Sequence, residues 1–341
     1  MKSDPFIIIN PNAHSGKLGK NLDKILKTTR EYIGDFQYKL TERGRHEVEI
    51  AEKAIKDGYK TIVALGGDGT ATNMGDVAVN HPEITLGLIS AGSMCDWHRT
   101  HSIPYHLKDS LEIFAEGHVE KFPAMKCSGD KTYYAFDMAD GGFTAKAAAA
   151  SFTEMKWLKI GVIKYNYLAF KYVIKFPNVP CTVTIDDGDP IEIKELTNVF
   201  ASFGDDIVGF HVLPGNPYLI RKHADFGIAI AHGMKGLRRI SMLIKASYMF
   251  KPGQHLGMRG CWLSRGRRML VESKHIALPW ETEGEIFNEK GFKVEIERID
   301  DALNLIVPKE REYKQEYDES IYNESFEESF HKREYEKLED T

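Results

Sequence analysis

The pentapeptide Gly66-Gly67-Asp68-Gly69-Thr70 constrains the fold more than any other stretch of this sequence. It follows the apolar run Thr61–Leu65, which predicts a buried strand, and precedes Ala71–Asn80, which can form a helix. Glycines let the main chain bring its N–H groups close to an anion, and the N-terminus of a following helix adds partial positive charge. This order predicts a phosphate-binding loop, with Asp68 expected to hold Mg²⁺. The alternative is an ordinary strand-to-helix turn capped by Asp68.

The first hundred residues alternate between strand-like and helix-like patterns. Phe6–Ile9 and Ile84–Ile89 are apolar runs, and apolar residues recur at helical spacing between them. Thr41 is expected to cap one of these helices. Repeated strand and helix signals with short connections predict a parallel sheet that is covered by helices on both faces.

The pattern changes around Phe122-Pro123. Downstream segments are short and β-biased, with turns between them, which predicts mostly antiparallel strands. The final segment, from Lys309, holds twelve acidic and six basic residues and neither Gly nor Pro. Its apolar residues fall mostly four apart, which favours a docked helix and leaves a solvated tail as the alternative. We therefore expect domains at 1–124 and 125–308 and a charged, helical tail at 309–341.

Composition narrows the class of protein. No run of about 18 apolar residues predicts a membrane-spanning helix. The net charge of −5 comes from the acidic final segment, so the body is close to neutral. No nucleic-acid-binding module accompanies its cations, so we expect no nucleic-acid partner. The four cysteines form no CxxC pair, which predicts reduced thiols in a cytoplasmic protein; they are Cys95, Cys127, Cys181 and Cys261.

Two long stretches contain cations without a single acidic residue. Met155–Phe176 has five lysines and Lys235–Arg268 has nine Lys or Arg, and both also hold aromatic and aliphatic residues. A cation near an anionic leaflet contributes about 1 kcal/mol, and aromatic rings suit the headgroup level. The stretches predict transient contact with an anionic membrane surface. The alternative is an ordinary solvated face above a packed core.

A second polar loop follows the first predicted strand. It runs through Asn10-Pro11 to Gly16-Lys17, and its small residues, amides and lysine suit nucleotide phosphates. Its spacing is not that of a Walker A loop. By itself it is equally consistent with an ordinary polar turn.

These segments, in this order, resemble the catalytic domain of the diacylglycerol kinases. The resemblance is carried by Asn10-Pro11 with Gly16-Lys17, by Thr41–His46 and by Gly66–Thr70, and it continues in Gly92–Arg99 and Leu278–Glu285. The family includes diacylglycerol, sphingosine and ceramide kinases and bacterial lipid kinases. It implies an α/β fold: an N-terminal Rossmann-like nucleotide domain, similar to that of NAD kinase and phosphofructokinase, and a C-terminal antiparallel β-sandwich domain.

The resemblance also implies an activity and a set of site residues. It implies a lipid kinase that uses ATP and Mg²⁺ to phosphorylate a hydroxyl of a diacylglycerol-like or sphingoid-like lipid, and it is compatible with a homodimer. Glu283 takes the position of the general base, while Asp68 and Glu285 take those of the magnesium ligands. The expected nucleotide contacts are Asn10, Pro11, Gly16, Lys17, Thr41, Gly66, Gly67, Asp68, Gly69, Thr70, Gly92, Ser93, Asp96 and Glu285.

The acidic tripeptide Glu283-Gly284-Glu285 can be interpreted without the family. On an extended chain residues two apart face the same side, so both carboxylates are expected to point into one cleft. Asp96 is the next candidate for a base, because it follows the predicted strand Ile84–Ile89. The neighbouring His98 and His101 are expected at the surface.

Three departures from the family pattern leave alternatives open. Cys95 stands where the family has Asn, Asn73 where it has Glu, and Glu283 where it has Asp. One alternative is an enzyme similar to NAD kinase, which shares the glycine loop. The other is a nucleotide-binding regulatory protein that has lost transfer activity.

Overall fold

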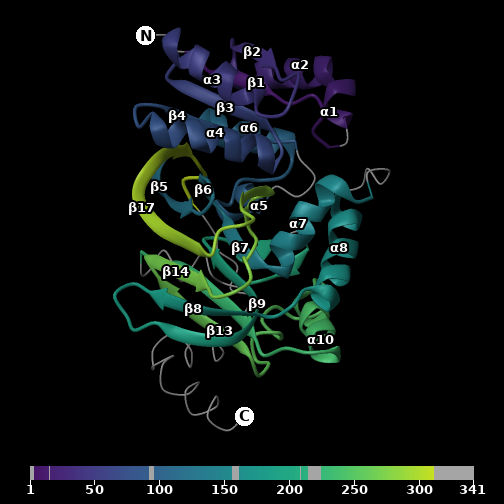
Figure 1. Ribbon diagram of the computed structural model, residues 1–341. Coiled ribbons are helices and arrows are strands. Elements are labelled where there is room, and N and C mark those ends of the chain that lie inside the picture. Colours follow the sequence, from purple (N-terminus) through teal and green to yellow (C-terminus); the bar gives the residue numbers. More distant parts are fainter. Residues whose placement is uncertain are drawn as a thin grey trace. The chain divides into compact units, whose positions relative to one another are not determined.

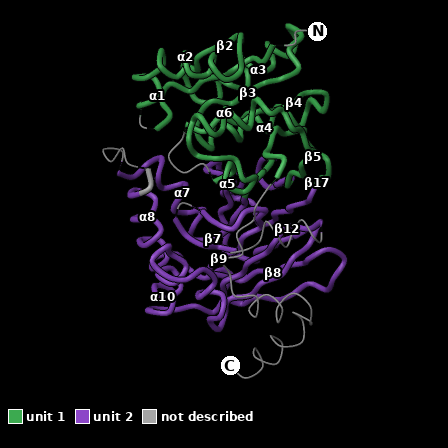
Figure 2. Tube along the Cα trace, turned by 180° about the vertical axis from the view of Figure 1, so that it is seen from behind, with its two compact units in different colours: residues 1–125, 134–137, 299–312 green, residues 126–133, 138–298, 313–341 purple. Residues whose placement is uncertain are grey.

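The computed structural model describes residues 4–14, 16–91, 96–155, 161–207, 209–213 and 224–310. Figure 2 shows two compact units: unit 1 takes residues 1–125, 134–137 and 299–312, and unit 2 the rest. The chain therefore leaves unit 1 and returns to it. The predicted helix in the final segment lies outside the described residues from position 311 onward, as do Gly92, Ser93 and Cys95.

Unit 1 is built from alternating strands and helices, as the hydrophobic pattern predicts (Figure 1). Its elements are β1 (Phe6–Ile9), α1 (Lys17–Lys20), α2 (Leu22–Ile33), β2 (Gln37–Leu40), α3 (His46–Lys56), β3 (Thr61–Gly66), α4 (Asp68–Asn80), β4 (Thr85–Ser90), α5 (Asp96–Thr100) and α6 (Leu107–Glu116). Strands β5 (Val119–Ser128), β6 (Thr132–Ala135) and β17 (Lys293–Ile306) each have residues in both units.

The strands of unit 1 form a parallel sheet in the order β17-β4-β3-β1-β2. Strand β1 pairs with β2 on one side and with β3 on the other. The strand order reverses between β1 and β3, and such a reversal opens a crevice at the carboxyl ends of the strands. The two polar loops predicted from the sequence follow these two strands.

Alternate side chains of the sheet enter two separate apolar cores. Ile8 and Ala64 pack with helices α3 and α4 on one face. Ile7 and Leu65 pack with α2 and α6 on the other. Burial on both faces explains why these strands are continuous apolar runs.

In its described residues, unit 2 contains an antiparallel sheet and three helices. Its elements are β7 (Met138–Gly142), α7 (Phe143–Thr153), α8 (Gly161–Lys175), β8 (Val179–Ile185), β9 (Ile191–Ser202), β10 (Asp206–Ile207), β11 (Phe210–His211), β12 (Phe226–His232), α10 (Leu237–Ala246), β13 (Cys261–Gly266), β14 (Arg268–Ser273), β15 (Trp280–Thr282) and β16 (Glu285–Asn288), with the first part of β17.

The long strand β9 organises the unit 2 sheet. Its first half pairs with β8, whereas Asn198–Ser202 pairs with β7 on one side and with β12 on the other, always antiparallel. Strand β7 ends at Gly142, whose φ of 120° turns the chain into helix α7. A Cβ there would lie 2.5 Å from the carbonyl oxygen of Thr197, so only glycine fits. The alanine-rich α7 then packs against α8.

The predicted fold class is confirmed: an α/β unit with a parallel sheet, together with an antiparallel β unit. The helices of the second unit were not predicted from the sequence. In the part of the chain that the structure describes, no helix is both long and apolar enough to cross a membrane.

Candidate functional site

The two predicted loops of unit 1 meet at the point where the strand order reverses. The Asn10 side-chain amide donates a hydrogen bond to the Thr70 hydroxyl over 3.1 Å. The Asn10 main-chain N–H donates to the carbonyl oxygen of Leu65, also over 3.1 Å. The Asn10 side-chain oxygen accepts the N–H of Asn12 at 3.0 Å. Asn10 therefore fixes the loop after β1 against the glycine loop after β3.

Helix α4 begins three residues earlier than predicted, at Asp68 instead of Ala71. Gly67 is its extended N-cap, so Asp68 and Gly69 form the first helical turn. The first N–H groups of a helix have no partner within the helix, and they attract anions. No heavy atom lies within 4 Å of a Cβ built on Gly69, whereas a Cβ on Gly66 would lie 2.7 Å from the Thr70 hydroxyl oxygen. The loop thus presents N–H groups beside open space, as a nucleotide phosphate requires.

Asp68 also contacts the segment that follows β4. One of its carboxyl oxygens accepts the main-chain N–H of Trp97 in helix α5 at 3.3 Å. Asp96, at the start of that helix, pairs with Arg99. Asp68 and Asp96 are therefore both on the edge of the sheet that carries the loops, because β3 and β4 are parallel neighbours.

The remaining nucleotide contacts predicted in unit 1 lie on neighbouring turns. Gly16 has a φ of 79° and precedes α1, whose exposed first residue is Lys17. The Pro11 carbonyl oxygen accepts the N–H of Gly19 at 3.0 Å and holds this turn closed. These contacts give the loop a defined shape, with a cation at its rim.

The prediction that Thr41 caps a helix is wrong. Helix α3 begins at His46, with Arg45 as its N-cap. Thr41 is buried, and its N–H donates to the Ile9 carbonyl oxygen at 2.9 Å. It therefore extends the pairing of β2 with β1 at the same edge of the sheet as the glycine loop.

The residues of the glycine loop fit a magnesium–nucleotide complex. Mg²⁺ is usually held by one or two carboxylates, with phosphate oxygens and water as the other ligands. Asp68 supplies a carboxylate beside the first turn of α4. Among the described residues, no three His, Cys, Asp or Glu side chains are grouped as a protein-only metal site would need.

Asn73, which departs from the family pattern, connects two charged residues. Its side-chain oxygen accepts a hydrogen bond from Arg45 at 2.9 Å, and its nitrogen donates to Glu47 at 2.7 Å. An amide can accept and donate at once, whereas an ionised carboxylate can only accept. Asn73 therefore suits a position between an arginine and a glutamate.

The expectation that His98 and His101 are surface residues is wrong. Both side chains are buried, with 1% and 6% of their surface exposed. The His101 ring packs edge-on against Phe122. Burial lowers the pKa of His98 to about 4, so its ring is neutral at physiological pH. Both histidines belong to the core of unit 1.

In unit 2, the expected geometry of Glu283 and Glu285 is also wrong. Strands β15 and β16 form a hairpin in which Thr282 pairs with Glu285. Glu283 and Gly284 are the two residues of its turn, with φ values of 50° and 93°. Two positive φ values are typical of a tight hairpin turn, so this chain is not extended. Glu283 lies at the tip of the turn and Glu285 at the start of β16.

A second pair of carboxyls, which was not predicted from the sequence, lies beneath this hairpin. Glu281 is directly opposite Asp140 in the pairing of β15 with β7, and both are buried. The N–H of Gly284 donates to Glu281 Oε2 over 2.5 Å. Burial raises the pKa of Asp140 well above its usual range, and the charge of Glu281 raises it further. Burial also raises the pKa of Glu281.

Asp140 is connected in turn to two polar residues of the unit 2 core. Its carboxyl contacts the Thr144 hydroxyl. That hydroxyl lies 2.8 Å from Asn198 Oδ1, and the Thr144 main-chain N–H donates to the same oxygen over 3.1 Å. In the sequence, the local indication of the turn from β7 to α7 was an acid followed by two glycines, Asp140-Gly141-Gly142.

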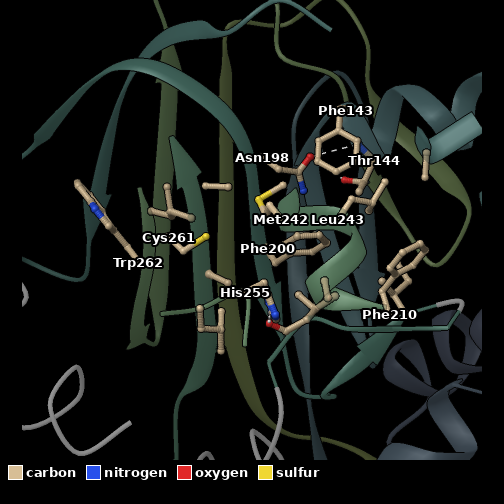
Figure 3. Close-up of a pocket in the computed structure, with 18 of the residues that line it drawn as sticks. Phe143, Thr144, Asn198, Phe200, Phe210, Met242, Leu243, His255, Cys261 and Trp262 are labelled. Carbon is tan, nitrogen blue, oxygen red and sulfur yellow. Dashed lines mark hydrogen bonds between the residues drawn. The ribbon is translucent and has the colours of Figure 1, made fainter. Parts of the chain in front are cut away.

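Thr144 and Asn198 also line an apolar pocket of about 620 Å³, including its mouth (Figure 3). The wall comes mainly from α7, α8, α10 and the strands β9 to β13, and from the segment between α10 and β13. Its large apolar members include Phe143, Phe200, Phe210, Met242, Leu243 and Trp262.

Several cations of the two acid-free stretches have partners elsewhere in unit 2. Arg268 pairs with Glu295 at 2.5 Å and Arg265 with Asp225 at 3.6 Å. Arg239 is buried and donates to the carbonyl oxygen of Met234, among others. Some cations of the two acid-free stretches therefore interact with other residues of unit 2, which the sequence alone could not show.

Comparison with known proteins bears directly on unit 1. Residues 4–127 match the sequence model of the diacylglycerol kinase catalytic domain, a little over a third of the chain. A diacylglycerol kinase of Staphylococcus aureus (strain bovine RF122 / ET3-1) is 24% identical over 188 residues, 54% of this chain and 58% of the relative. One of Staphylococcus saprophyticus is 22% identical over 209 residues, 60% of this chain and 67% of the relative. The match thus spans little more than half the length of the Staphylococcus aureus relative.

Solved structures extend the likeness of fold beyond unit 1. A putative diacylglycerol kinase from Bacillus anthracis str. Sterne aligns with a TM-score of 0.68 and 17% identity, covering 90% of this chain and 95% of that one. A second diacylglycerol kinase structure from the same organism aligns with a TM-score of 0.65 and 16% identity, covering 90% and 97%. At this identity the structures establish the fold alone. Together with the match over residues 4–127, they confirm that this chain resembles the diacylglycerol kinase catalytic-domain family.

Proposed function

We propose that this chain is an ATP-dependent lipid kinase that transfers the γ-phosphate of Mg·ATP to a hydroxyl of a lipid. One observation carries the proposal: the glycine loop that begins α4 stands at the strand-order reversal of a sheet, inside the segment that matches the diacylglycerol kinase catalytic domain. Phosphoryl transfer needs mainly positioning and charge neutralisation, which helix N–H groups and a metal ion supply.

Roles follow for the carboxylates of both units. Asp68 and Glu285 are assigned to Mg²⁺, which would neutralise charge on the transferred phosphate. Glu283 is assigned as the general base that accepts the proton of the lipid hydroxyl. Its place at the tip of a hairpin turn supports this role, because a side chain there remains reachable by a substrate.

A lipid acceptor is supported by the outer surface of unit 2 as well as by its pocket. Four apolar side chains of α8 are exposed on one helical face: Ile163, Tyr167, Phe170 and Ile174. Leu237 at the start of α10 is 83% exposed and Met249 just after that helix is 86% exposed. Apolar side chains among lysines suit the surface of an anionic membrane. We propose that this face makes the transient membrane contact of a kinase that otherwise stays in the cytoplasm.

An acceptor screen with labelled ATP tests the proposal. The full chain is incubated with diacylglycerol vesicles, with sphingosine and with NAD, and Asp68→Asn serves as the inactive control. A labelled lipid that is lost with Asp68→Asn supports the proposed function. Labelled NADP would instead identify an NAD kinase. ATP binding without transfer to any acceptor would identify a regulatory protein and contradict the proposal.

A further inference from the structure

Asn198 is a polar group of the unit 2 pocket whose orientation is fixed. Asn198 is buried and lies on β9, and its Oδ1 faces the main-chain N–H of Thr144 at 3.1 Å. A nitrogen in that place would set two donors against each other, so the hydrogen-bond pattern decides which end of the amide is oxygen. The Asn198 Nδ2 group must therefore point the other way, and in Figure 3 the labelled side chain directs its nitrogen away from Thr144.

That nitrogen has no hydrogen-bond partner among the residues that the structure describes, although it is buried. Buried amide donors nearly always have an acceptor, because an unpaired donor loses its bonds to water without replacement. The pocket wall near it is apolar, with Phe143, Phe200 and Met242 among the labelled side chains. The missing partner is therefore an acceptor on a molecule that is otherwise largely apolar.

The charges around the pocket limit this acceptor to a neutral group. Asp140 and Glu281 lie behind Thr144, and a pair of interacting carboxyls disfavours another anion. His255 lines the pocket and its Nε2 bonds to the Val212 carbonyl oxygen over 3.1 Å. Its ring is neutral, because burial lowers its pKa to about 4. Among the described residues that line the pocket, there is no Lys or Arg that could hold a carboxylate.

We propose that this pocket binds a fatty acyl chain whose ester carbonyl oxygen accepts a hydrogen bond from Asn198 Nδ2. The hydrocarbon fills the apolar wall, and the carbonyl supplies the acceptor that the protein lacks. A sphingoid base has a chain of the same kind but an ammonium group in place of a carbonyl, and it would set a donor against a donor. The inference rests on the proposed lipid kinase function in one respect: the bound acyl chain is taken to belong to the lipid that accepts the phosphate. That lipid is then an acylated glycerol.

The test uses two soluble lipids that differ in one atom group. Binding of 1-decanoyl-glycerol and of 1-O-decyl-glycerol to the full protein chain is measured by calorimetry without ATP. Decylamine is measured in the same way as a soluble analogue of a sphingoid base. The ester is expected to bind about tenfold more tightly than the ether, the equivalent of one hydrogen bond to a buried donor. Decylamine is expected to bind more weakly than the ester. Equal affinities for ester and ether would overturn the inference.

Two variants locate the effect in the pocket. Asn198→Asp keeps the oxygen that faces Thr144 and replaces the donor by an acceptor, so the preference for the ester should disappear. Leu243→Trp fills the pocket and should abolish binding of ester and ether alike. Unchanged ester binding in either folded variant would place the lipid elsewhere. Since none of these measurements uses ATP, a chain that binds the ester but phosphorylates nothing would refute the proposed function and leave this inference standing.

Discussion

Asp140 and Glu281 face each other across the pairing of β7 with β15, and neither side chain reaches solvent. Burial and the charge of Glu281 raise the pKa of Asp140 well above its usual range, which favours the protonated form of Asp140. Glu281 also accepts the N–H of Gly284, which is in the turn that presents Glu283. The pair therefore supports the turn that carries the proposed general base.

The first prediction is a loss of stability with rising pH that depends on this pair. The pKa of Asp140 is raised in the folded protein, so the folded state binds more protons than the unfolded state. Its contribution is complete below the unfolded pKa of about 3.9 and is lost as pH rises through the raised folded value. Asp140→Asn stays neutral throughout, so its stability should increase relative to wild type as pH rises. Urea unfolding at pH 5 and pH 8 measures the difference.

The prediction compares the stability of wild type with that of Asp140→Asn, because other groups make stability rise with pH in both proteins. Burial lowers the pKa of His98 and His255 to about 4, so they add stability as pH rises toward about 6.5. Both proteins contain them, and their effect cancels. A stability difference that stays constant with pH would show that Asp140 is ionised in the folded state.

The second prediction separates two roles of Asp68. Asp68→Asn and Asp68→Ala should each lower phosphoryl transfer by more than tenfold, a barrier increase of about 1.4 kcal/mol, because both lose the charge that holds Mg²⁺. Asparagine keeps an oxygen for the Trp97 N–H and alanine does not. Only Asp68→Ala should therefore lower the melting temperature. If Asp68→Asn retains most of the wild-type rate, Asp68 serves only to cap α5.

The third prediction concerns Glu283 and Glu285. Glu283→Gln should depress turnover with little effect on ATP affinity, because a base acts on the acceptor and not on the nucleotide. Glu283→Asn should do the same and also stabilise the hairpin, since Asn-Gly is the preferred pair for a turn with two positive φ values. Glu285→Gln should instead raise the Mg²⁺ concentration needed for half-maximal activity. Normal turnover by both Glu283 variants would make Asp96 the next candidate for the base.

The sequence predicted unit 1 well because the information there is local. Each strand is an apolar run that ends in a polar loop, and parallel pairing places those loops at one edge of the sheet. Asn10 and Thr70 could thus be assigned to one site before their 3.1 Å hydrogen bond was known. The start of α4 at Asp68 was missed, because glycines are poor helix formers and masked its first turn.

The candidate site in unit 2 could not be predicted in the same way. Whether Glu281 meets Asp140 depends on the register of two strands that are far apart in the sequence. Treating Glu283-Gly284-Glu285 as extended ignored the turn preference of glycine, which the Glu-Gly pair did indicate. The partners of Arg265 and Arg268 are likewise on distant segments.

The fourth prediction assigns membrane contact to exposed apolar residues and not to paired cations. Leu237→Ser with Met249→Ser should weaken sedimentation with anionic vesicles, because both side chains are almost fully exposed. Arg265→Ser with Arg268→Ser should have a smaller effect, because both arginines already pair with carboxylates. Binding of the wild type should decrease with salt, as the Debye length falls from about 10 Å at 0.1 M to about 3 Å at 1 M. Equal binding to neutral and anionic vesicles would contradict an electrostatic contribution to membrane binding.

The last prediction asks whether the glycine loop binds phosphate or is only a turn. Gly66→Ala would place a methyl group 2.7 Å from the Thr70 hydroxyl oxygen, so it should destabilise unit 1 by about 1–3 kcal/mol. Gly69→Ala meets no heavy atom within 4 Å and replaces a helical glycine, so it should leave stability unchanged or increase it by up to about 1 kcal/mol. The same methyl group would occupy the space into which a phosphate must come. Gly69→Ala should therefore weaken Mg·ATP binding in calorimetry while its melting temperature holds. A Gly69→Ala protein with wild-type ATP affinity would mean that these glycines serve only the turn from β3 to α4.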